Sequence, residues 1–524
     1  MPQAPPFNPQ QALGEALNLH RQGRLDEAEK LYTRVLKMRR DHFDALHLLG
    51  MLNHQRGKPA EAYRLIIAAL KADPRSADAL ANLALVLHSL KRDAEAMQSL
   101  DRALAIAPDN LNAHNARGIL LSDLNRPAEA LAAFDRLLAA QPQNPSALYN
   151  RGNALRSLGR EADAIATYDR ALAAMPSHVK AWHNRGLALQ ALNRHREAVA
   201  SYGKAVGLQP DYADAHFNAG AALLTLGDYR AGLPEYEWRW QRAGMSVRKD
   251  LRKPLWLGEA ALTGKTILLH AEQGLGDTVM FARYAPVLAR QGAKVVLEVQ
   301  PELKGLLAGL ADTVVARGAP LPPHDLHCPL ASLPLACKTE LSIIPAEIPY
   351  LRASEERIAH WRTRLEVLPA PRVALVWSGR ATHANDRNRS IGLKRLEPLL
   401  AVPGVSFVSL QRELKPDDAA LLAGDKRIAP MGDELRDFAD TAAVLALADL
   451  VVCVDTSVAH VAAALGRPAF ILLPFQPDWR WLLDRDTSPW YPNARLFRQP
   501  APGDWDSVIA RMRDALAADY SSKP

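Results

Sequence analysis

The stretch PSALYNRGNALRSLGREADAIATYDRALAAMP, residues 145–176, decides the fold of the N-terminal half of this chain. It reads as two helical segments, with the small residues Gly152, Ala164 and Ala171 where two antiparallel helices would cross closely. It ends at Pro176, and proline ends a helix because it lacks the amide donor and clashes with the preceding turn. The stretch therefore predicts a helical hairpin.

The same pattern recurs in steps of 34 residues. The recurring positions are Gly50, Ala84, Gly118, Gly152 and Gly186; Ala62, Ala96, Ala130, Ala164 and Ala198; Ala69, Ala103, Leu137 (the exception), Ala171 and Ala205; and Pro74, Pro108, Pro142, Pro176 and Pro210. A fixed period of this length is the signature of a repeat array, and this one is identified as a tetratricopeptide repeat. We expect about seven repeats over residues 9–246, with atypical terminal repeats that cap the stack.

One polar position also repeats. Asn82, Asn150, Asn184 and Asn218 take the sixth position of the first helix of their repeats. Each amide offers a donor and an acceptor, so this column is a candidate binding groove for the backbone of an extended acceptor peptide. The alternative is that the amides bond neighbouring repeats and hold the stack together. The column resembles the asparagine ladder of the nucleocytoplasmic O-GlcNAc transferases.

The periodicity changes after a tryptophan-bearing linker at residues 247–262. Short apolar runs at 266–270, 295–299, 373–377, 405–410, 447–454 (from a helix end into a strand) and 470–473 alternate with helical segments, including 278–292 and 392–401. This alternation predicts parallel sheets. We expect an α solenoid followed by α/β structure, with one Rossmann-like domain at 263–350 and a second, nucleotide-sugar-binding one at 371–515. Ligands of such sheets bind beyond the carboxyl ends of the strands.

Composition sets the remaining limits. The 524 residues carry a formal charge of +7 without a long basic run, which argues against a nucleic-acid partner. Three widely spaced cysteines predict neither a disulfide framework nor a zinc site. The first residues lack the pattern of a signal peptide, and no apolar run is long enough to cross a bilayer. We expect a cytoplasmic protein with no membrane span.

The loop after the strand at 266–270 is the first candidate site. Gln273, Gly274, Gly276 and Asp277 lie where the strand passes into a helix, and glycines there allow a tight turn and close approach to a ligand. The aspartate is either a functional group or a cap of the helix.

A second polar set follows the strand that ends at Val454. Asp455, Thr456 and Ser457 open a helix of small residues, and His460 lies in its first turn. Free amides at a helix N-terminus bind phosphate, so we expect this terminus and its hydroxyls to hold a diphosphate. Asp455 would contact sugar hydroxyls or fix the loop, and His460 is either a phosphate contact or structural.

Arginines in the loop after Trp377 are the third candidate. Arg380, Arg387 and Arg389 suit a pyrophosphate, because guanidinium groups bind phosphate in bidentate fashion. The alternative is a solvated surface loop.

GLGD at 274–277 and DTSVAHVAAALGRP at 455–468 together resemble the bacterial heptosyltransferase-like glycosyltransferases of family 9, which are GT-B enzymes with two Rossmann-like domains. The resemblance covers roughly residues 262–515. With the repeats in front, the layout is similar to O-GlcNAc transferase and to bacterial protein glycosyltransferases, including those that modify flagellin.

The resemblance implies an inverting glycosyl transfer from a nucleotide sugar, with no metal and no cofactor besides that donor. It gives Asp277 the role of general base. It gives donor binding to Arg389, Asp455, Thr456, Ser457 and His460, and it gives recognition of the nucleoside or ribose to Gln411 or Glu413. Gln273, Gly274, Gly276 and Arg380 join the expected donor site because of the loops that carry them. Ser457 stands where the family usually has glycine, and Arg389 stands near a lysine of the family.

The repeats imply a protein acceptor, such as flagellin or another surface protein, with a Ser or Thr hydroxyl as nucleophile. Two other functions remain open. In the first, the chain is an adaptor with a degenerate transferase domain. In the second, it is a transferase that acts on a glycan such as lipopolysaccharide.

Overall fold

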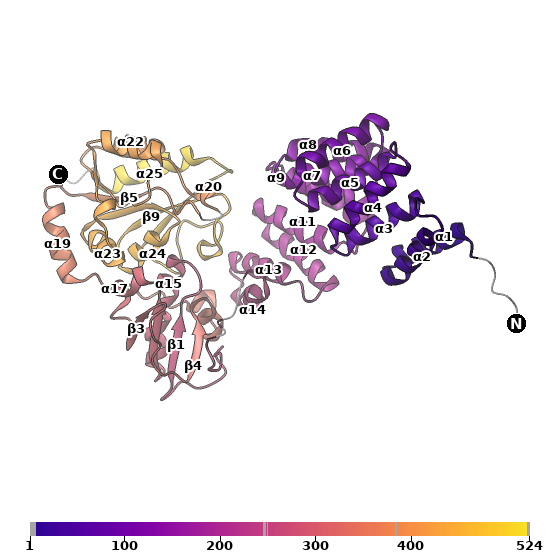
Figure 1. The fold of residues 1–524 in the computed structure, drawn as a ribbon. Coiled ribbons are helices and arrows are strands. Elements are labelled where there is room, and N and C mark those ends of the chain that lie inside the picture. Colours follow the sequence, from indigo (N-terminus) through magenta and orange to yellow (C-terminus); the bar gives the residue numbers. More distant parts are fainter. Residues whose placement is uncertain (1–6, 245–247, 249, 383–384, 521–524) are drawn as a thin grey trace. The chain divides into compact units, whose positions relative to one another are not determined.

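The computed structural model describes residues 7–244, 248, 250–382 and 385–520 (Figure 1). Internal contacts group the chain into two compact units, residues 1–192 and 193–524. The expected fold class is confirmed, because helical repeats come first and parallel sheets with helices follow. No helix within the described ranges is long and apolar enough to cross a membrane.

The first unit consists of antiparallel helices. Its elements are α1 (Pro9–Arg21), α2 (Leu25–Met38), α3 (Phe43–Gln55), α4 (Pro59–Ala72), α5 (Ala77–Ser89), α6 (Asp93–Ile106), α7 (Leu111–Asp123), α8 (Pro127–Ala140), α9 (Pro145–Ser157), α10 (Glu161–Ala174) and α11 (Val179–Ala191). Side chains of Ser76, Asn110 and Asn144 accept hydrogen bonds from backbone amides in the first turns of α5, α7 and α9 and so fix where these helices begin.

Two of the repeated glycines are required by close contacts with an aromatic ring of the second helix of the same repeat. A Cβ atom on Gly118 would come within 2.5 Å of the Phe134 ring, and one on Gly152 within 2.4 Å of the Tyr168 ring. The repeated alanines Ala62, Ala96, Ala130 and Ala164 have no exposed surface. Larger side chains at these positions would separate the helices of each pair, because protein interiors are closely packed.

Ion pairs follow the same 34-residue period. Arg117, Arg151 and Arg185 bond Asp101, Asp135 and Asp169, at 3.2, 2.7 and 2.6 Å. Each pair joins the first helix of one repeat to the second helix of the repeat before it. These ion pairs therefore connect consecutive repeats of the stack.

The second unit begins with α12 (His195–Leu208), α13 (Ala213–Thr225), α14 (Tyr229–Tyr236) and the 3-10 helix η1 (Glu237–Gln241). α14 is shorter than the other repeat helices and carries Pro234. Its aromatic side chains Tyr229 and Tyr236 belong to the same apolar core cluster as Ile267 and Ile471 of the two sheets. The last repeat is therefore packed into the α/β part of the chain.

The first sheet holds four parallel strands in the order β3-β2-β1-β4. They are β1 (Thr266–His270), β2 (Lys294–Val299), β3 (Thr313–Ala316) and β4 (Leu326–Pro329). Ile267 pairs with Val295 on one side and with Leu326 on the other. The helical elements of this part are α15 (Leu275–Ala282), α16 (Tyr284–Arg290), η2 (Pro301–Leu303), α17 (Lys304–Leu307), η3 (Leu330–Ser332), α18 (Leu333–Ala336) and η4 (Leu341–Ile343).

The second sheet holds six parallel strands in the order β10-β9-β8-β5-β6-β7. They are β5 (Arg372–Val376), β6 (Ser406–Ser409), β7 (Ile428–Pro430), β8 (Leu450–Val454), β9 (Ala469–Leu473) and β10 (Ala494–Arg498). The helical elements are α19 (Glu355–Leu365), α20 (Asp386–Arg389), η5 (Leu393–Leu396), α21 (Glu397–Leu400), α22 (Pro416–Gly424), η6 (Gly432–Glu434), α23 (Phe438–Leu447), α24 (Ser457–Ala464), η7 (Trp479–Trp481) and α25 (Trp505–Tyr520).

Two expected helices differ in detail. The segment 278–292 is broken into α15 and α16, because Pro286 cannot donate to the carbonyl of Ala282, where α15 ends. The segment 392–401 forms η5 followed by α21 instead of one α-helix. Strands β3, β4, β7 and β10 are short, and the apolar pattern did not predict them.

Candidate functional site

The two glycine- and hydroxyl-bearing turns meet. Gly276, in the first turn of α15, lies against the first turn of α24: a Cβ on Gly276 would come 2.8 Å from Cδ2 of His460 and 3.4 Å from Cα of Ser457. α15 follows β1 and α24 follows β8, so the carboxyl ends of both sheets contribute to one place. The absence of a side chain at Gly276 makes this approach possible.

Asp277 lies at this junction and is half-buried. Its Oδ2 accepts a 3.0 Å hydrogen bond from the amide of Gly274, so the carboxylate caps α15. Its Oδ1 lies 2.5 Å from Nη2 of Arg480 in an ion pair. The N-cap residue of α15 is Gly274 and not Asp277, which caps the amide of Gly274 from the third position of the helix.

Arg480 comes from η7, which follows β9, and it is 6% exposed. Its Nη1 also bonds Oδ1 of Asp478 at 2.8 Å, and the guanidinium lies 4.6 Å from the ring centre of Trp479. Burial by itself would lower the pKa of Arg480, but the carboxylates of Asp277 and Asp478 raise it well above its ordinary value. The side chain is therefore a permanent buried cation between two anions.

The N-terminus of α24 holds the other predicted donor-binding residues. Thr456 is the N-cap residue, yet its hydroxyl makes no capping hydrogen bond, and Oγ1 is buried without a partner among the described residues. Burial, followed by the charge of Asp478, raises the pKa of Asp455 to about 6. A buried hydroxyl without a partner beside free helix amides is suited to an anionic ligand.

Arg389 is the one predicted arginine placed at this terminus. Its Nη1 donates a 3.0 Å hydrogen bond to the carbonyl of Asp455, and the guanidinium packs against Gly379, where a Cβ would come within 2.5 Å of Nη2. Its Nε is buried without a hydrogen-bond partner in the described part of the chain. Arg387 is exposed in the same short helix.

Arg380 and Gln411 lie differently. The Arg380 side chain is 63% exposed and is 3.9 Å from the carboxylate of Glu413. The Gln411 amide is buried: its Oε1 accepts from the amides of Trp377 and Ser378, and its Nε2 donates to the carbonyls of Ser378 and Glu413. Gln411 therefore fixes the loop after β5, and that loop leads to Arg389.

His460 is buried and uncharged. Burial, with the nearby charge of Arg480, lowers its pKa to about 3. Nδ1 lies 3.0 Å from the hydroxyl of Tyr491, and the ring stacks on Trp481 with 5.4 Å between centroids. At neutral pH the residue offers a neutral ring that supports the turn at Gly276, not a cation for a phosphate group.

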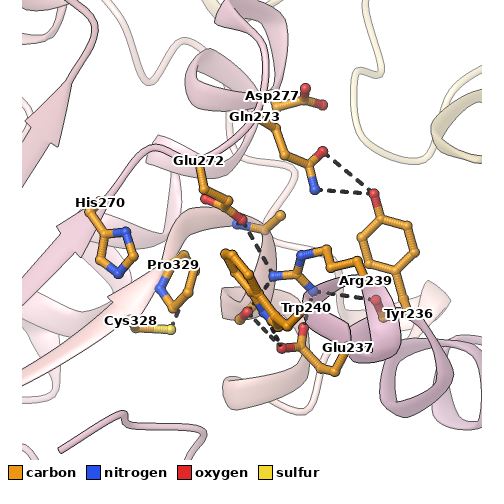
Figure 2. A network of polar contacts seen from close by, with 12 residues as sticks. Tyr236, Glu237, Arg239, Trp240, His270, Glu272, Gln273, Asp277, Cys328 and Pro329 are labelled. Atoms are coloured by element: carbon orange, nitrogen blue, oxygen red, sulfur yellow. Dashed lines mark hydrogen bonds and ion pairs between the residues drawn. The ribbon is translucent and has the colours of Figure 1, made fainter. Parts of the chain in front are cut away.

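The loop that carries Asp277 is held from the last repeat (Figure 2). The hydroxyl of Tyr236 is 3.2 Å from Nε2 of Gln273. Arg239, 1% exposed, bonds Oε1 of Glu237 at 2.5 Å and Oε1 of Glu272 at 3.3 Å. Burial raises the pKa of Glu272 to about 7, and the charge of Arg239 opposes that rise. Gln273 is thus held by the last helix of the repeat array.

The predicted asparagine column bonds neighbouring repeats at two of its positions. Nδ2 of Asn82 lies 2.8 Å from Nε2 of His47, and Nδ2 of Asn184 donates to Oδ1 of Asn153 at 2.8 Å. Both partners belong to the preceding repeat. Asn150 and Asn218 are half-buried in α9 and α13. Asn82 and Asn184 therefore follow the alternative in which the amides bond neighbouring repeats and hold the stack together.

Arg480, Asp478 and Arg239 lie at the site although the sequence patterns did not single them out. A usable signal was present: Asp478-Trp479-Arg480-Trp481 follows the buried strand β9 within a few residues. Carboxyl ends of parallel strands are where ligand sites form. Among the described residues, no group of three or more histidine, cysteine, aspartate and glutamate side chains could hold a metal ion.

Comparisons with known proteins agree with the division into helical repeats and an α/β part. Tetratricopeptide repeat models match residues 13–67, 55–110, 115–178 and 188–227. The model of glycosyltransferase family 9 (heptosyltransferase) matches residues 436–473, the segment that contains β8, the 455–460 turn and α24. Protein FlbA of Caulobacter vibrioides is 29% identical over 286 residues, which are 50% of this chain and 48% of that protein. The chain thus spans about half the length of this curated relative.

Solved structures of repeat proteins are also similar. The type IV pilus biogenesis factor PilW is 28% identical, with a TM-score of 0.35 over 38% of this chain and 91% of that chain. A tetratricopeptide repeat protein from Parabacteroides merdae is 17% identical, with a TM-score of 0.35 over 46% of this chain and 94% of that chain. The chain thus carries tetratricopeptide repeats in its N-terminal half and, within its C-terminal α/β part, a segment at 436–473 that is similar to glycosyltransferase family 9.

Proposed function

We propose that this chain is a protein glycosyltransferase of the GT-B type. It takes a sugar from a nucleotide-sugar donor and transfers it to a Ser or Thr hydroxyl of a protein that the repeats bind. The observation that carries the proposal is the contact of Gly276 with Ser457 and His460, which brings the Asp277 carboxylate and the α24 terminus to one junction between the two sheets. A base and an anion site in one place are what glycosyl transfer requires.

The donor side of the proposal rests on two polar atoms without partners. Oγ1 of Thr456 and Nε of Arg389 are both buried and lack hydrogen-bond partners among the described residues. Arg389 is tied to the same turn through the Asp455 carbonyl. Buried polar groups are normally satisfied, so these two donors, with the α24 amides, fit the oxygens of a diphosphate.

The chemical step balances without further groups. A carboxylate oxygen of Asp277 takes the proton of the acceptor hydroxyl, and the hydroxyl oxygen forms a bond to the anomeric carbon. The bond from that carbon to the diphosphate oxygen breaks, and its electron pair leaves with the nucleoside diphosphate. A single displacement inverts the anomeric configuration. General base action contributes about 10²–10⁴-fold to such rates, and fixed donors stabilise the leaving charge.

The acceptor side rests on the repeat array. Repeats of this type provide an extended surface that grows with their number, and here they precede the transferase part directly. Since Asn82 and Asn184 bond within the stack, the acceptor would be recognised by the other side chains of the array.

A thermal-shift panel tests the proposal. The full chain is melted with UDP, GDP, ADP and CMP at millimolar concentration and with sugar conjugates of each. A ligand that binds only the folded state at a hundredfold excess over Kd stabilises it by about 2.7 kcal/mol. We expect one nucleotide family to raise the Tm of the α/β transition.

The matched variants are Thr456→Val and Thr441→Val. The first removes the hydroxyl without a partner and should abolish the shift. The second removes a hydroxyl that bonds the Asp437 carbonyl within α23 and should keep the shift. No shift with any nucleotide would overturn the proposal and favour an adaptor that lacks transferase activity.

A further inference from the structure

Arg480 is the most constrained charged group of the candidate site. It is 6% exposed, and two neighbours in the chain hold it: the Asp478 carboxylate accepts from its backbone amide, at 3.0 Å, and from its Nη1, at 2.8 Å, while the Trp479 ring covers one face of the guanidinium. A guanidinium held in this way is planar and fixed in direction. Its Nη2 lies 2.5 Å from Oδ1 of Asp277 and 3.5 Å from Oε1 of Gln273.

One partner would be enough to neutralise the buried charge of Arg480. Asp478, two residues away on the same segment, already supplies that partner. The second ion pair, to Asp277 at 2.5 Å, joins the part of the chain that follows β9 to the part that follows β1. A buried ion pair contributes little net stability, because both groups lose their hydration. A contribution to stability therefore does not explain why Arg480 has this second partner.

We infer that Arg480 is a positioning residue, which fixes the Asp277 carboxylate of the first sheet relative to the donor site of the second sheet. This inference rests on the proposed function, in which Asp277 is the base. The Gly274 amide holds Oδ2 of that carboxylate, and Arg480 holds Oδ1, so both its location and its rotation are set. Arg480 itself acts only through Asp277 and needs no contact with the substrate.

The charge of Arg480 also favours the ionised, proton-accepting form of the carboxylate. An opposite charge within about 4–6 Å typically lowers the pKa of an acid by 1–3 units. Removal of the cation should therefore move the acid limb of the rate profile to higher pH. Lysine in place of arginine keeps the charge but cannot hold Asp277 and Asp478 in the same plane.

The test compares Arg480→Gln, Arg480→Lys and Arg357→Gln in the full chain. Arg357→Gln is the matched control, because Arg357 bonds the fully buried carboxylate of Asp440 at 2.8 Å and does not contact Asp277. The readouts are Tm, the thermal shift with the nucleotide that stabilises the wild type, and release of nucleoside diphosphate from UDP-glucose, GDP-mannose or ADP-glucose between pH 5 and 9.

For Arg480→Gln we expect kcat to fall about 10²-fold, as for a misplaced reacting group, while KM for the donor and the thermal shift stay near wild type. Its acid limb should move to higher pH. Arg480→Lys should keep the acid limb near wild type and lose less of kcat. Arg357→Gln should lower Tm and leave kcat and the pH profile unchanged.

The outcomes separate the two proposals. If the wild type neither binds nor cleaves any of these donors, the proposed function is overturned and this inference with it. If the wild type is active and Arg480→Gln keeps kcat and the acid limb, only the positioning role is overturned. Should Arg480→Gln not fold, Arg480→Lys decides: an unchanged kcat in that variant overturns the inference as well.

Discussion

Gly276 and His460 touch without room for another atom: a Cβ on Gly276 would lie 2.8 Å from Cδ2 of the imidazole. This contact sets the separation of α15 from α24. The two helices begin the candidate site's acceptor and donor sides, so a change in their separation alters the distance between Asp277 and Thr456.

Gly276→Ala should destabilise the chain by about 1–3 kcal/mol, the usual cost of overpacking a buried contact. It should also weaken the thermal shift by nucleotide, because α24 moves away. Urea unfolding and the thermal-shift panel measure the two effects. Gly203→Ala is the control: Gly203 lies in α12 with no atom within 4 Å of its would-be Cβ, so that variant should be neutral or slightly stabilising. Equal stability of both variants would contradict the contact.

Asp277→Asn should reduce turnover by at least about 10²-fold, because the amide cannot accept the proton. Its Oδ atom can still accept from the Gly274 amide, so the thermal shift by nucleotide should persist. Release of nucleoside diphosphate and the Tm difference are measured on the same preparation. Wild-type turnover in this variant would remove Asp277 from the role of base.

Tyr229→Phe should lower stability by about 1–3 kcal/mol, because the buried Nε1 of Trp490 loses the Tyr229 hydroxyl, which accepts its hydrogen bond at 2.8 Å. The effect should appear in the unfolding of the α/β part, since α14 packs into its core. Tyr520→Phe, which removes a 3.4 Å bond from a half-buried hydroxyl, should change stability little. If Tyr229→Phe leaves the Tm of the α/β part unchanged, the last repeat unfolds independently of that part.

Asp455→Asn should change the pH dependence of stability. Burial raises the pKa of Asp455 to about 6 in the folded chain, so the folded state prefers the protonated carboxyl, and wild-type stability falls as pH rises from about 4 to about 6. The variant lacks this loss. Its Tm should exceed that of the wild type above pH 6, by an amount equivalent to at most about 3 kcal/mol, and approach it near pH 4. A pH-independent difference would contradict the shift.

His88→Gln should matter most in mildly acidic solution. Burial alone lowers the pKa of His88, but hydrogen bonds to Asp93 and Asp123 raise it above its ordinary value. The charged histidine therefore stabilises the first unit below about pH 6.5, and this contribution is lost as pH rises through the raised pKa. Hydrogen exchange of α5 and α7, compared between variant and wild type, should differ at pH 6 and converge by pH 9. A constant difference would argue against the ion pairs.

Much of the first half could be predicted because the relevant contacts are local. Gly152 faces Tyr168 within one helical hairpin, so the need for a small residue is written into each repeat. The asparagine column shows the limit of that logic. Its period was visible, but whether Asn82 faces a ligand or His47 depends on how consecutive hairpins stack.

The second half divides in the same way. Apolar runs and flanking polar turns predicted β1, β8 and the two turns at 273–277 and 455–460, because a buried strand and its capping residues are adjacent in the chain. Arg480 and Arg239 escaped notice because each acts on a carboxylate far from it in sequence, Asp277 and Glu272 respectively. Pairing of this kind depends on side-chain direction, which no periodicity reports.

The sequence by itself determined that a repeat array is followed by parallel sheets and that two polar turns lie at strand ends. Each of these follows from neighbours in the chain: helix crossings that demand small residues, strands that demand apolar runs and helix termini that demand caps. Only the tertiary structure decided that the last repeat holds the loop of Asp277 and that Arg480 joins Asp277 to the segment that follows β9. Those contacts bring together segments that are distant in the chain. The burial that drives them depends on the apolar surface area removed from water and not on the order of residues along the chain.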